Sequence, residues 1–381
     1  MDKSKLIYLM GITVSIILGI SETQSQFLLS TSIHNAFDDN VNNNYLNTYD
    51  RLTQFSLQTG YDFEGERKNF QVFYIGTYNY YRNVIARSFH THSTGLVYTK
   101  LYGEESETAL NLGANYNLRI GREDFTYFDN SQYIGYLNIK HQISERTFGK
   151  LGYRIRYLTY KELSDLNNLE NYFFAQLTNF FPSRTTLALE ANLGIKSYTN
   201  APPETTVINP GMGRGKSTIK DNNPSVIQLA GNIRIAQSIF DETGLSIAGG
   251  YQKNIQQETR YLSSGYIISD DDLFDDNYGY EGPSFEATLT QVLPWLMMGK
   301  VSFNFMNKNY VNRPAYDLSD NIKSNERIDN VYMVSLILEK EFNLLNGFTI
   351  SLMYDYIRNA SNDDFYNYKN NVWAISFDLG F

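Results

Sequence analysis

The stretch VWAISFDLGF, residues 372–381, decides the fold. Large apolar residues alternate in it with small or polar ones, so an extended strand would have one apolar face. The stretch finishes on Phe381, with no polar tail behind it. A membrane-spanning β-barrel has a reason to end this way, because its last strand pairs with its first and removes the exposed sheet edge. We therefore expect the final strand of a transmembrane barrel; an ordinary edge strand is the other interpretation.

This final strand resembles the C-terminal strand of bacterial outer-membrane proteins. In that family the terminal aromatic strand is also recognised by the barrel-assembly machinery. The resemblance implies two partners: the lipid of the outer membrane around the barrel, and the assembly machinery during biogenesis.

Composition agrees with a barrel and excludes several other classes. The 381 residues include 31 tyrosines, 24 phenylalanines and no cysteine. In barrel strands the apolar residues that face lipid alternate with polar residues, and girdles of aromatic residues lie at both membrane interfaces. Without cysteine the chain has no disulfide and no thiolate metal site. A net charge of -9 argues against nucleic acid as a partner.

The N-terminal segment has the features of an export signal. Lys3 and Lys5 precede an apolar run from Leu6 to Ile20, which is short for a spanning helix. Small residues near Ser25 suggest cleavage after that position. We therefore predict a signal peptide over residues 1–25 and one barrel domain over residues 26–381; an uncleaved anchor helix is the alternative.

The remainder of the chain is a series of alternating segments, and residues 109–121 are the clearest of them. About sixteen such segments are present, each near the roughly ten residues that a tilted membrane-spanning strand needs. The predicted strands cover residues 27–36, 51–63, 70–81, 91–102, 109–121, 133–143, 148–160, 171–181, 185–198, 225–239, 245–253, 284–293, 299–308, 331–342, 348–358 and 371–381.

The connections between these segments alternate in length. Short ones, rich in Gly and Pro, follow the even-numbered strands, as at 103–108 and 240–244. The longer ones are 37–50, 82–90, 122–132, 161–170, 199–224, 254–283, 309–330 and 359–370. Short periplasmic turns and long extracellular loops are typical of outer-membrane barrels. The fold class is therefore an all-β, antiparallel, up-and-down barrel with both termini in the periplasm.

Charged residues on the polar face of these strands would line the lumen. The basic ones cluster on the strands between 109 and 239, and most acidic ones lie on the strands between 284 and 381. The predicted lumen-lining residues are Arg119, Lys140, Arg154, Arg156, Glu190, Lys196, Arg234, Glu286, Glu339, Asp355 and Asp378. Two opposed walls of charge would align polar solutes, whereas a packed, salt-bridged lumen would conduct nothing. Both interpretations remain open at this point.

No stretch indicates an enzyme, and no cofactor is predicted. His141 and Ser144 are three residues apart and so face opposite sides of a strand, unlike the His and Ser of outer-membrane phospholipases. A carboxylate cluster in the longest loop is a weak candidate for Ca²⁺, although it lacks the residue order of an EF-hand. The cluster consists of Asp270, Asp271, Asp272, Asp275 and Asp276.

Over residues 27–381 the chain resembles a sixteen-stranded barrel of porin type. This resemblance is architectural and includes no functional motif. The third long connection, 122–132, is shorter than the pore-narrowing loop of general porins, and the long-chain fatty-acid channels have an N-terminal hatch that we do not find here. The leading hypothesis is passive passage of small polar solutes or ions. The alternative is a non-conducting structural or adhesive barrel whose long loops bind a partner.

Overall fold

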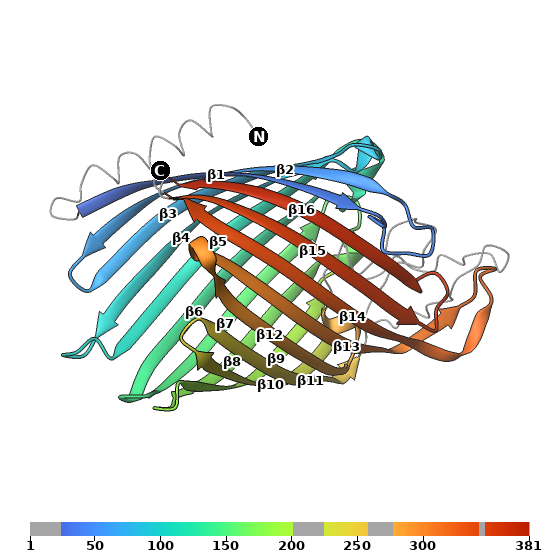
Figure 1. Cartoon of the computed structure of the whole chain (residues 1–381). Coiled ribbons are helices and arrows are strands. Elements are labelled where there is room, and N and C mark those ends of the chain that lie inside the picture. Colours follow the sequence, from blue (N-terminus) through green and yellow to red (C-terminus); the bar gives the residue numbers. More distant parts are fainter. Residues whose placement is uncertain (1–23, 201–224, 258–276, 343–346, 381) are drawn as a thin grey trace.

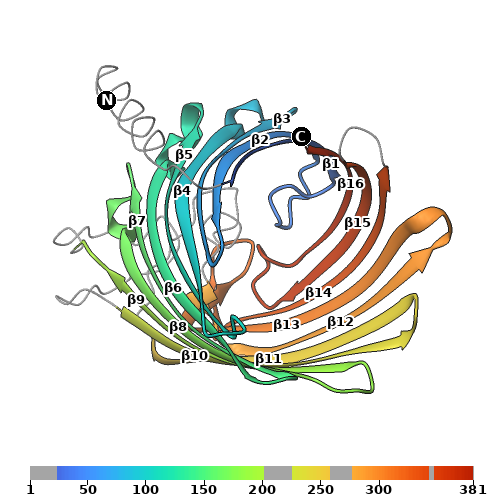
Figure 2. The same ribbon diagram turned by 90° about the vertical axis from the view of Figure 1, so that its left-hand side faces the viewer.

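The computed structural model describes residues 24–200, 225–257, 277–342 and 347–380, which form a closed, all-antiparallel barrel (Figures 1 and 2). Each strand pairs with its neighbours in sequence, and β16 closes the barrel against β1. The sixteen strands are β1 (Gln24–Asp38), β2 (Asp50–Gly65), β3 (Lys68–Tyr81), β4 (Phe89–Tyr102), β5 (Thr108–Gly121), β6 (Asn130–Ser144), β7 (Thr147–Tyr160), β8 (Asn168–Phe180), β9 (Thr185–Tyr198), β10 (Ser225–Phe240), β11 (Thr243–Gln257), β12 (Gly282–Leu293), β13 (Met297–Tyr316), β14 (Ile322–Phe342), β15 (Phe348–Ser361) and β16 (Tyr368–Gly380).

The barrel exposes apolar side chains on its outer face. Leu137 on β6 and Ile155 on β7 are 39% and 38% exposed, although both are large and apolar. The register places Leu112 opposite Leu137, so the same face continues on β5. A soluble protein would bury such a face, whereas a lipid-spanning barrel presents it to hydrocarbon. The predicted period-two pattern is therefore the pattern of the outer wall.

The C-terminal strand closes the barrel as expected. β16 pairs with β1 over nine positions, from Ser30 opposite Gly380 to Asp38 opposite Val372. Without this pairing, β1 and β16 would each leave a row of backbone donors and acceptors in lipid, where no water satisfies them. The prediction of an all-β barrel of porin type is confirmed.

The two rims of the barrel differ. At the rim where β1 begins and β16 ends, here called the turn side, the connections described throughout have two to five residues. At the opposite rim, the loop side, they have five to eleven. Short 3-10 helices lie in several connections: η1 (Ile85–Arg87), η2 (Glu123–Phe128), η3 (Ser164–Leu166) and η4 (Asn277–Gly279) on the loop side, and η5 (Pro294–Leu296) on the turn side.

One predicted connection is wrong. Residues 309–330 were expected to be a long loop, but β13 runs to Tyr316 and β14 starts at Ile322, so only residues 317–321 connect them. The hairpin extends beyond the loop-side rim (Figure 1). Register shifts on either side of Pro314, and Asn312 at φ 63°, interrupt the alternation from which strands are recognised. The β-bulge therefore explains why the alternating pattern of the sequence did not indicate a strand here.

Two predictions fall wholly or largely outside the described residues. These are the signal peptide, whose first 23 residues are not described, and the aspartate cluster at 270–276. β1 begins at Gln24, two residues before the expected start of the mature chain.

Candidate functional site: the lumen wall

All of the residues predicted to line the lumen lie on the inner face of the barrel, here called the lumen face. The register fixes this, because each has the opposite parity to exposed apolar residues of its own strand, as Arg154 does to Ile155. The set comprises Arg119, Lys140, Arg154, Arg156, Glu190, Lys196, Arg234, Glu286, Glu339, Asp355 and Asp378. Four of them, Lys140, Arg154, Arg234 and Glu286, are exposed although they face inward. The described residues therefore leave open space around these charges.

A buried carboxylate organises the basic wall near the loop side. The carboxylate of Glu170 on β8 accepts hydrogen bonds from Nη2 of Arg154 at 2.9 Å and from Nη2 of Arg156 at 2.6 Å. The Glu170 side chain is only 2% exposed. Lys196, buried on β9, lies directly opposite Glu170 in the register. Two arginines thus share one carboxylate. The Arg154 side chain keeps 45% of its surface exposed, so this excess positive charge faces the lumen.

Glu170 was absent from the predicted set, because β8 was expected to start at 171. The strand starts at Asn168, and the parity of Tyr172 and Phe174 then places Glu170 inward. Glu190, the predicted acidic residue of the basic wall, accepts a hydrogen bond at its Oε1 from the Asn192 amide at 2.9 Å. The sequence does contain a signal for Glu170. It lies one position before the predicted strand start and has the same parity as Tyr172 and Phe174, so extending the strand places it on the lumen face.

Residues 277–281, the described end of the connection between β11 and β12, pack on the lumen face beside this cluster. Tyr278 of η4 is buried, and its phenol oxygen lies 2.4 Å from where a Cβ on Gly194 would stand, on the lumen face of β9. Gln228 and Asn254 hold this segment by donating to the carbonyls of Asn277 and Tyr278 at 2.9 and 3.0 Å. Burial, and then the nearby Glu170 carboxylate, raise the pKa of Tyr278. The phenol therefore stays neutral at working pH.

The loop between β1 and β2 also turns inward, and Figure 2 shows it inside the outline of the barrel. Asn40 is fully buried there, and its side-chain amide donates to the Asn44 and Lys369 carbonyls at 2.7 and 3.1 Å. Arg87 of η1 donates to the Val41 carbonyl at 2.7 Å. Buried, satisfied polar networks of this kind hold a segment in one arrangement. This loop is therefore a fixed part of the loop-side opening.

The basic wall continues toward the turn side. Lys140 and Lys150 lie directly opposite each other on β6 and β7, and both face the lumen. Their ammonium groups lie over the Phe148 and Phe174 rings at 4.8 and 5.0 Å. Like charges directly opposite each other in a sheet are destabilising, so the Lys140–Lys150 pair lowers the stability of the barrel. Lys150 was not among the predicted residues, although the alternation of β7 places it inward.

At the loop side of the basic wall, Arg119 lies between two aromatic rings. Its guanidinium is 4.2 Å from the Phe89 centroid and 5.7 Å from that of Phe128 in η2. The connection carrying η2 therefore packs against the wall at this point.

The acidic wall is less uniform than predicted. Glu286, Glu339, Asp355 and Asp378 face the lumen from β12, β14, β15 and β16. However, β14 also contributes Arg327, which forms an ion pair with Asp329, and both residues are only 1% exposed. Arg327 was missed because its strand was assigned to a loop. The separation of charge across the lumen is therefore incomplete at the loop side.

Two kinds of feature are absent from the described part of the chain. Within the described residues, no group of three or more His, Cys, Asp or Glu side chains is placed to hold a metal ion. No helix in that part of the chain is long and apolar enough to cross a membrane.

Comparison with known proteins identifies similar barrels. A family model described as "Surface lipoprotein assembly modifier" matches residues 251–381, the stretch from β11 to the C-terminus. No curated protein matches the sequence. Among solved structures, OccAB1 of Acinetobacter baumannii has a TM-score of 0.55 at 10% identity, covering 95% of this chain and 98% of that one.

Two structures from Pseudomonas aeruginosa are also similar. OpdL has a TM-score of 0.52 at 11% identity, covering 94% of this chain and 98% of that one. The outer-membrane protein OpdK has a TM-score of 0.51 at 12% identity, covering 93% and 99%. At these identities the likeness establishes the fold, which is that of a porin-like outer-membrane barrel.

Proposed function

We propose that this protein is a channel of the bacterial outer membrane through which small polar solutes pass passively. The observation that carries the proposal is the exposure of inward-facing charges, among them Lys140, Arg234 and Glu286. Charged groups away from water are costly unless they are paired. Exposed charges along the lumen therefore favour a water-filled passage over a packed interior. No catalytic step is part of this proposal.

The turn side faces the periplasm and the loop side faces outward, as in barrels of this architecture. Outer-membrane lipid then contacts the apolar outer wall, and the assembly machinery acts during biogenesis. We expect the passage to be narrowest near the outside, where the loop at 39–49 lies inside the outline of the barrel (Figure 2) and Tyr278 packs against Gly194 of β9.

The topology is testable with epitope insertions. A tag in the connection 317–321, at the tip of the protruding hairpin, binds antibody on intact cells, because this tip lies beyond the rim (Figure 1). A tag at 145–146, between β6 and β7, binds only after the outer membrane is permeabilised. Antibody binding at 145–146 on intact cells contradicts the orientation.

We expect the purified protein to conduct ions in planar bilayers with a preference for anions. The exposed Arg154 and the pair Lys140 and Lys150 raise the anion concentration near the wall. Replacing Arg154 and Lys150 by Ala lowers the anion-to-cation permeability ratio toward one. The effect shrinks in about 1 M salt, where the Debye length falls to about 3 Å. Absence of conductance in the parent protein overturns the channel.

A second candidate is a barrel that binds or assembles a partner at the cell surface. It is favoured by the match of residues 251–381 to a family described by surface lipoprotein assembly, because this stretch contains the protruding hairpin. The hairpin tip exposes Leu318 and Ile322, which are 58% and 64% exposed. Shortening the hairpin removes partner binding in this case and leaves conductance intact in the channel case.

A further inference from the structure

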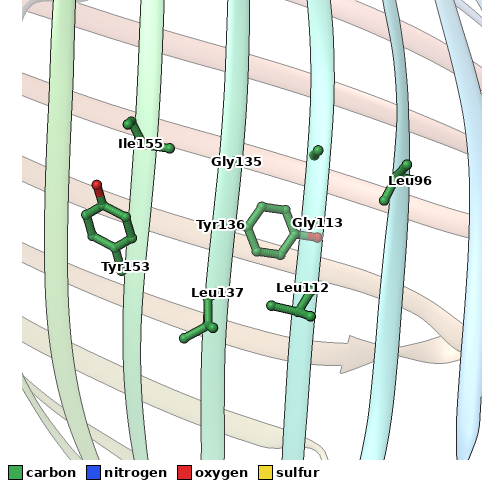
Figure 3. A pocket seen from close by; sticks show the side chains of 9 residues that line it. Leu96, Leu112, Gly113, Gly135, Tyr136, Leu137, Tyr153 and Ile155 are labelled. Carbon is green, nitrogen blue, oxygen red and sulfur yellow. The ribbon is translucent and has the colours of Figure 1, made fainter.

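Three inward-facing aromatic rings pack against glycines of the neighbouring strand. Atoms of the Phe73 ring come within 2.7 Å of the position that a Cβ on Gly95 would take. The corresponding distance is 2.2 Å for Tyr136 at Gly113 and 2.1 Å for Phe174 at Gly152. Real Cβ atoms do not approach rings this closely, so each ring occupies the volume that a side chain would fill. Figure 3 shows the Tyr136 ring reaching from β6 toward Gly113 on β5.

The rings share one level of the barrel. The glycines at 95, 113 and 152 lie six to eight residues from the loop-side ends of β4, β5 and β7, strands of fourteen residues each. The three ring–glycine pairs therefore form an arc at mid-height over β3 to β8. Each ring is partly covered and partly exposed. The Phe174 ring also has the Lys150 ammonium 5.0 Å from its centroid, so a cation lies beside this stacking position.

Amide side chains accompany the rings. The Asn138 amide oxygen lies 2.4 Å from the Cβ position of Gly152, where the Phe174 ring also lies. Asn115 pairs with Gly95 beside Phe73, and its amide donates to Asn117 at 3.1 Å. Amides both donate and accept hydrogen bonds, so they suit neighbouring hydroxyl groups. A flat aromatic face next to an amide offers a stacking surface and polar contacts at one place.

We propose that this arc is a binding site for pyranose sugars in transit. The negative face of an aromatic ring attracts the positively polarised C–H groups on the face of a sugar ring, and the amides bind its hydroxyls. Successive rings on β3, β6 and β8 give a saccharide one stacking position after another across the wall. The inference rests on the proposed channel function and names a solute class for it.

The test is reversible block of single-channel current by maltotriose. A polyethylene glycol of matched hydrodynamic radius serves as the non-stacking control probe. Maltotriose blocks the parent channel at lower concentration than the glycol does. Phe174→Ala raises the half-blocking concentration of maltotriose by about three- to tenfold, the value of one aromatic contact. Phe174→Tyr restores it, because the ring is retained.

Phe173→Ala is the matched control, since Phe173 is the neighbouring residue on β8 and is 44% exposed on the outer face. It leaves the block unchanged. Heat-dependent gel migration identifies correctly folded protein for every variant. Equal block by maltotriose and glycol, or an unchanged block in Phe174→Ala, overturns the sugar site while conductance persists. A parent protein without conductance instead overturns the channel itself.

Discussion

Replacing Asp329 by Ala lowers the free energy of unfolding by about 3–5 kcal/mol, because it removes a buried carboxylate that pairs with the buried guanidinium of Arg327. Arg327 Nε donates to both carboxylate oxygens of Asp329, at 3.0 and 3.1 Å. The guanidinium also lies 3.3 Å from the Tyr366 centroid and 4.2 Å from that of Tyr310. Water does not reach the charge in this setting, so it is not resolvated when the aspartate is removed.

The measurement is urea unfolding in detergent, followed by tryptophan fluorescence. The double variant Arg327→Met with Asp329→Leu is the informative control, because replacing both charges by apolar groups is often neutral or stabilising. Asp364→Ala is a second control, since its ion pair with Lys323 is 34–40% exposed and such pairs contribute little. A loss in Asp329→Ala no larger than that in Asp364→Ala contradicts the assigned role.

This cluster joins the protruding hairpin of β13 and β14 to the connection between β15 and β16 at the loop side. Tyr366 belongs to the connection between β15 and β16, whereas Arg327 and Tyr310 belong to the protruding hairpin. Asp363 adds to the junction by accepting from the Tyr316 backbone amide at 3.0 Å. We therefore expect Asp329→Ala to free the hairpin from the rim as well as to lower stability, which limited proteolysis of the hairpin detects.

The sequence predicted the barrel well, because alternation is a local signal. In β5 the odd positions carry Asn111, Asn115 and Arg119, and the even positions face outward, so parity alone assigns every side chain to a face. The same signal failed where the backbone departs from period two. Between Tyr310 and Pro314 the register shifts, and the loop-side halves of β13 and β14 were therefore predicted to be a loop.

The lumen was predicted only in part, because its contacts join distant residues. Parity placed Arg154 and Arg156 inward, but their shared partner Glu170 depended on a strand boundary, which is the least certain feature of a sequence pattern. Nothing local indicates that Tyr278 would pack on Gly194, more than eighty residues earlier in the chain. The ring–glycine contacts depend likewise on which glycine lies opposite each aromatic residue, and this requires the register.

The wall of the barrel gives a direct test of which face meets lipid. Ile233 and Asn232 are neighbours on β10, near the middle of the strand, and face outward and inward respectively. Ile233→Arg places a charge in hydrocarbon near the membrane midplane and lowers the free energy of unfolding by about 2–4 kcal/mol. Asn232→Arg points into the lumen, where the residue is already exposed, and changes stability by less than about 0.5 kcal/mol.

Reversible unfolding in lipid vesicles measures both variants against the parent protein. The two substitutions introduce the same side chain one position apart, so the new residue and its depth in the membrane are matched. The new charge meets hydrocarbon in one variant and the lumen in the other, and this difference is larger than the difference in strand propensity between the Ile and the Asn that are replaced. A sealed, dry lumen would penalise Asn232→Arg as well, since the charge would find neither water nor a partner there. Equal losses in the two variants would therefore contradict the water-filled passage, and a loss in Asn232→Arg alone would invert the assignment of the two faces.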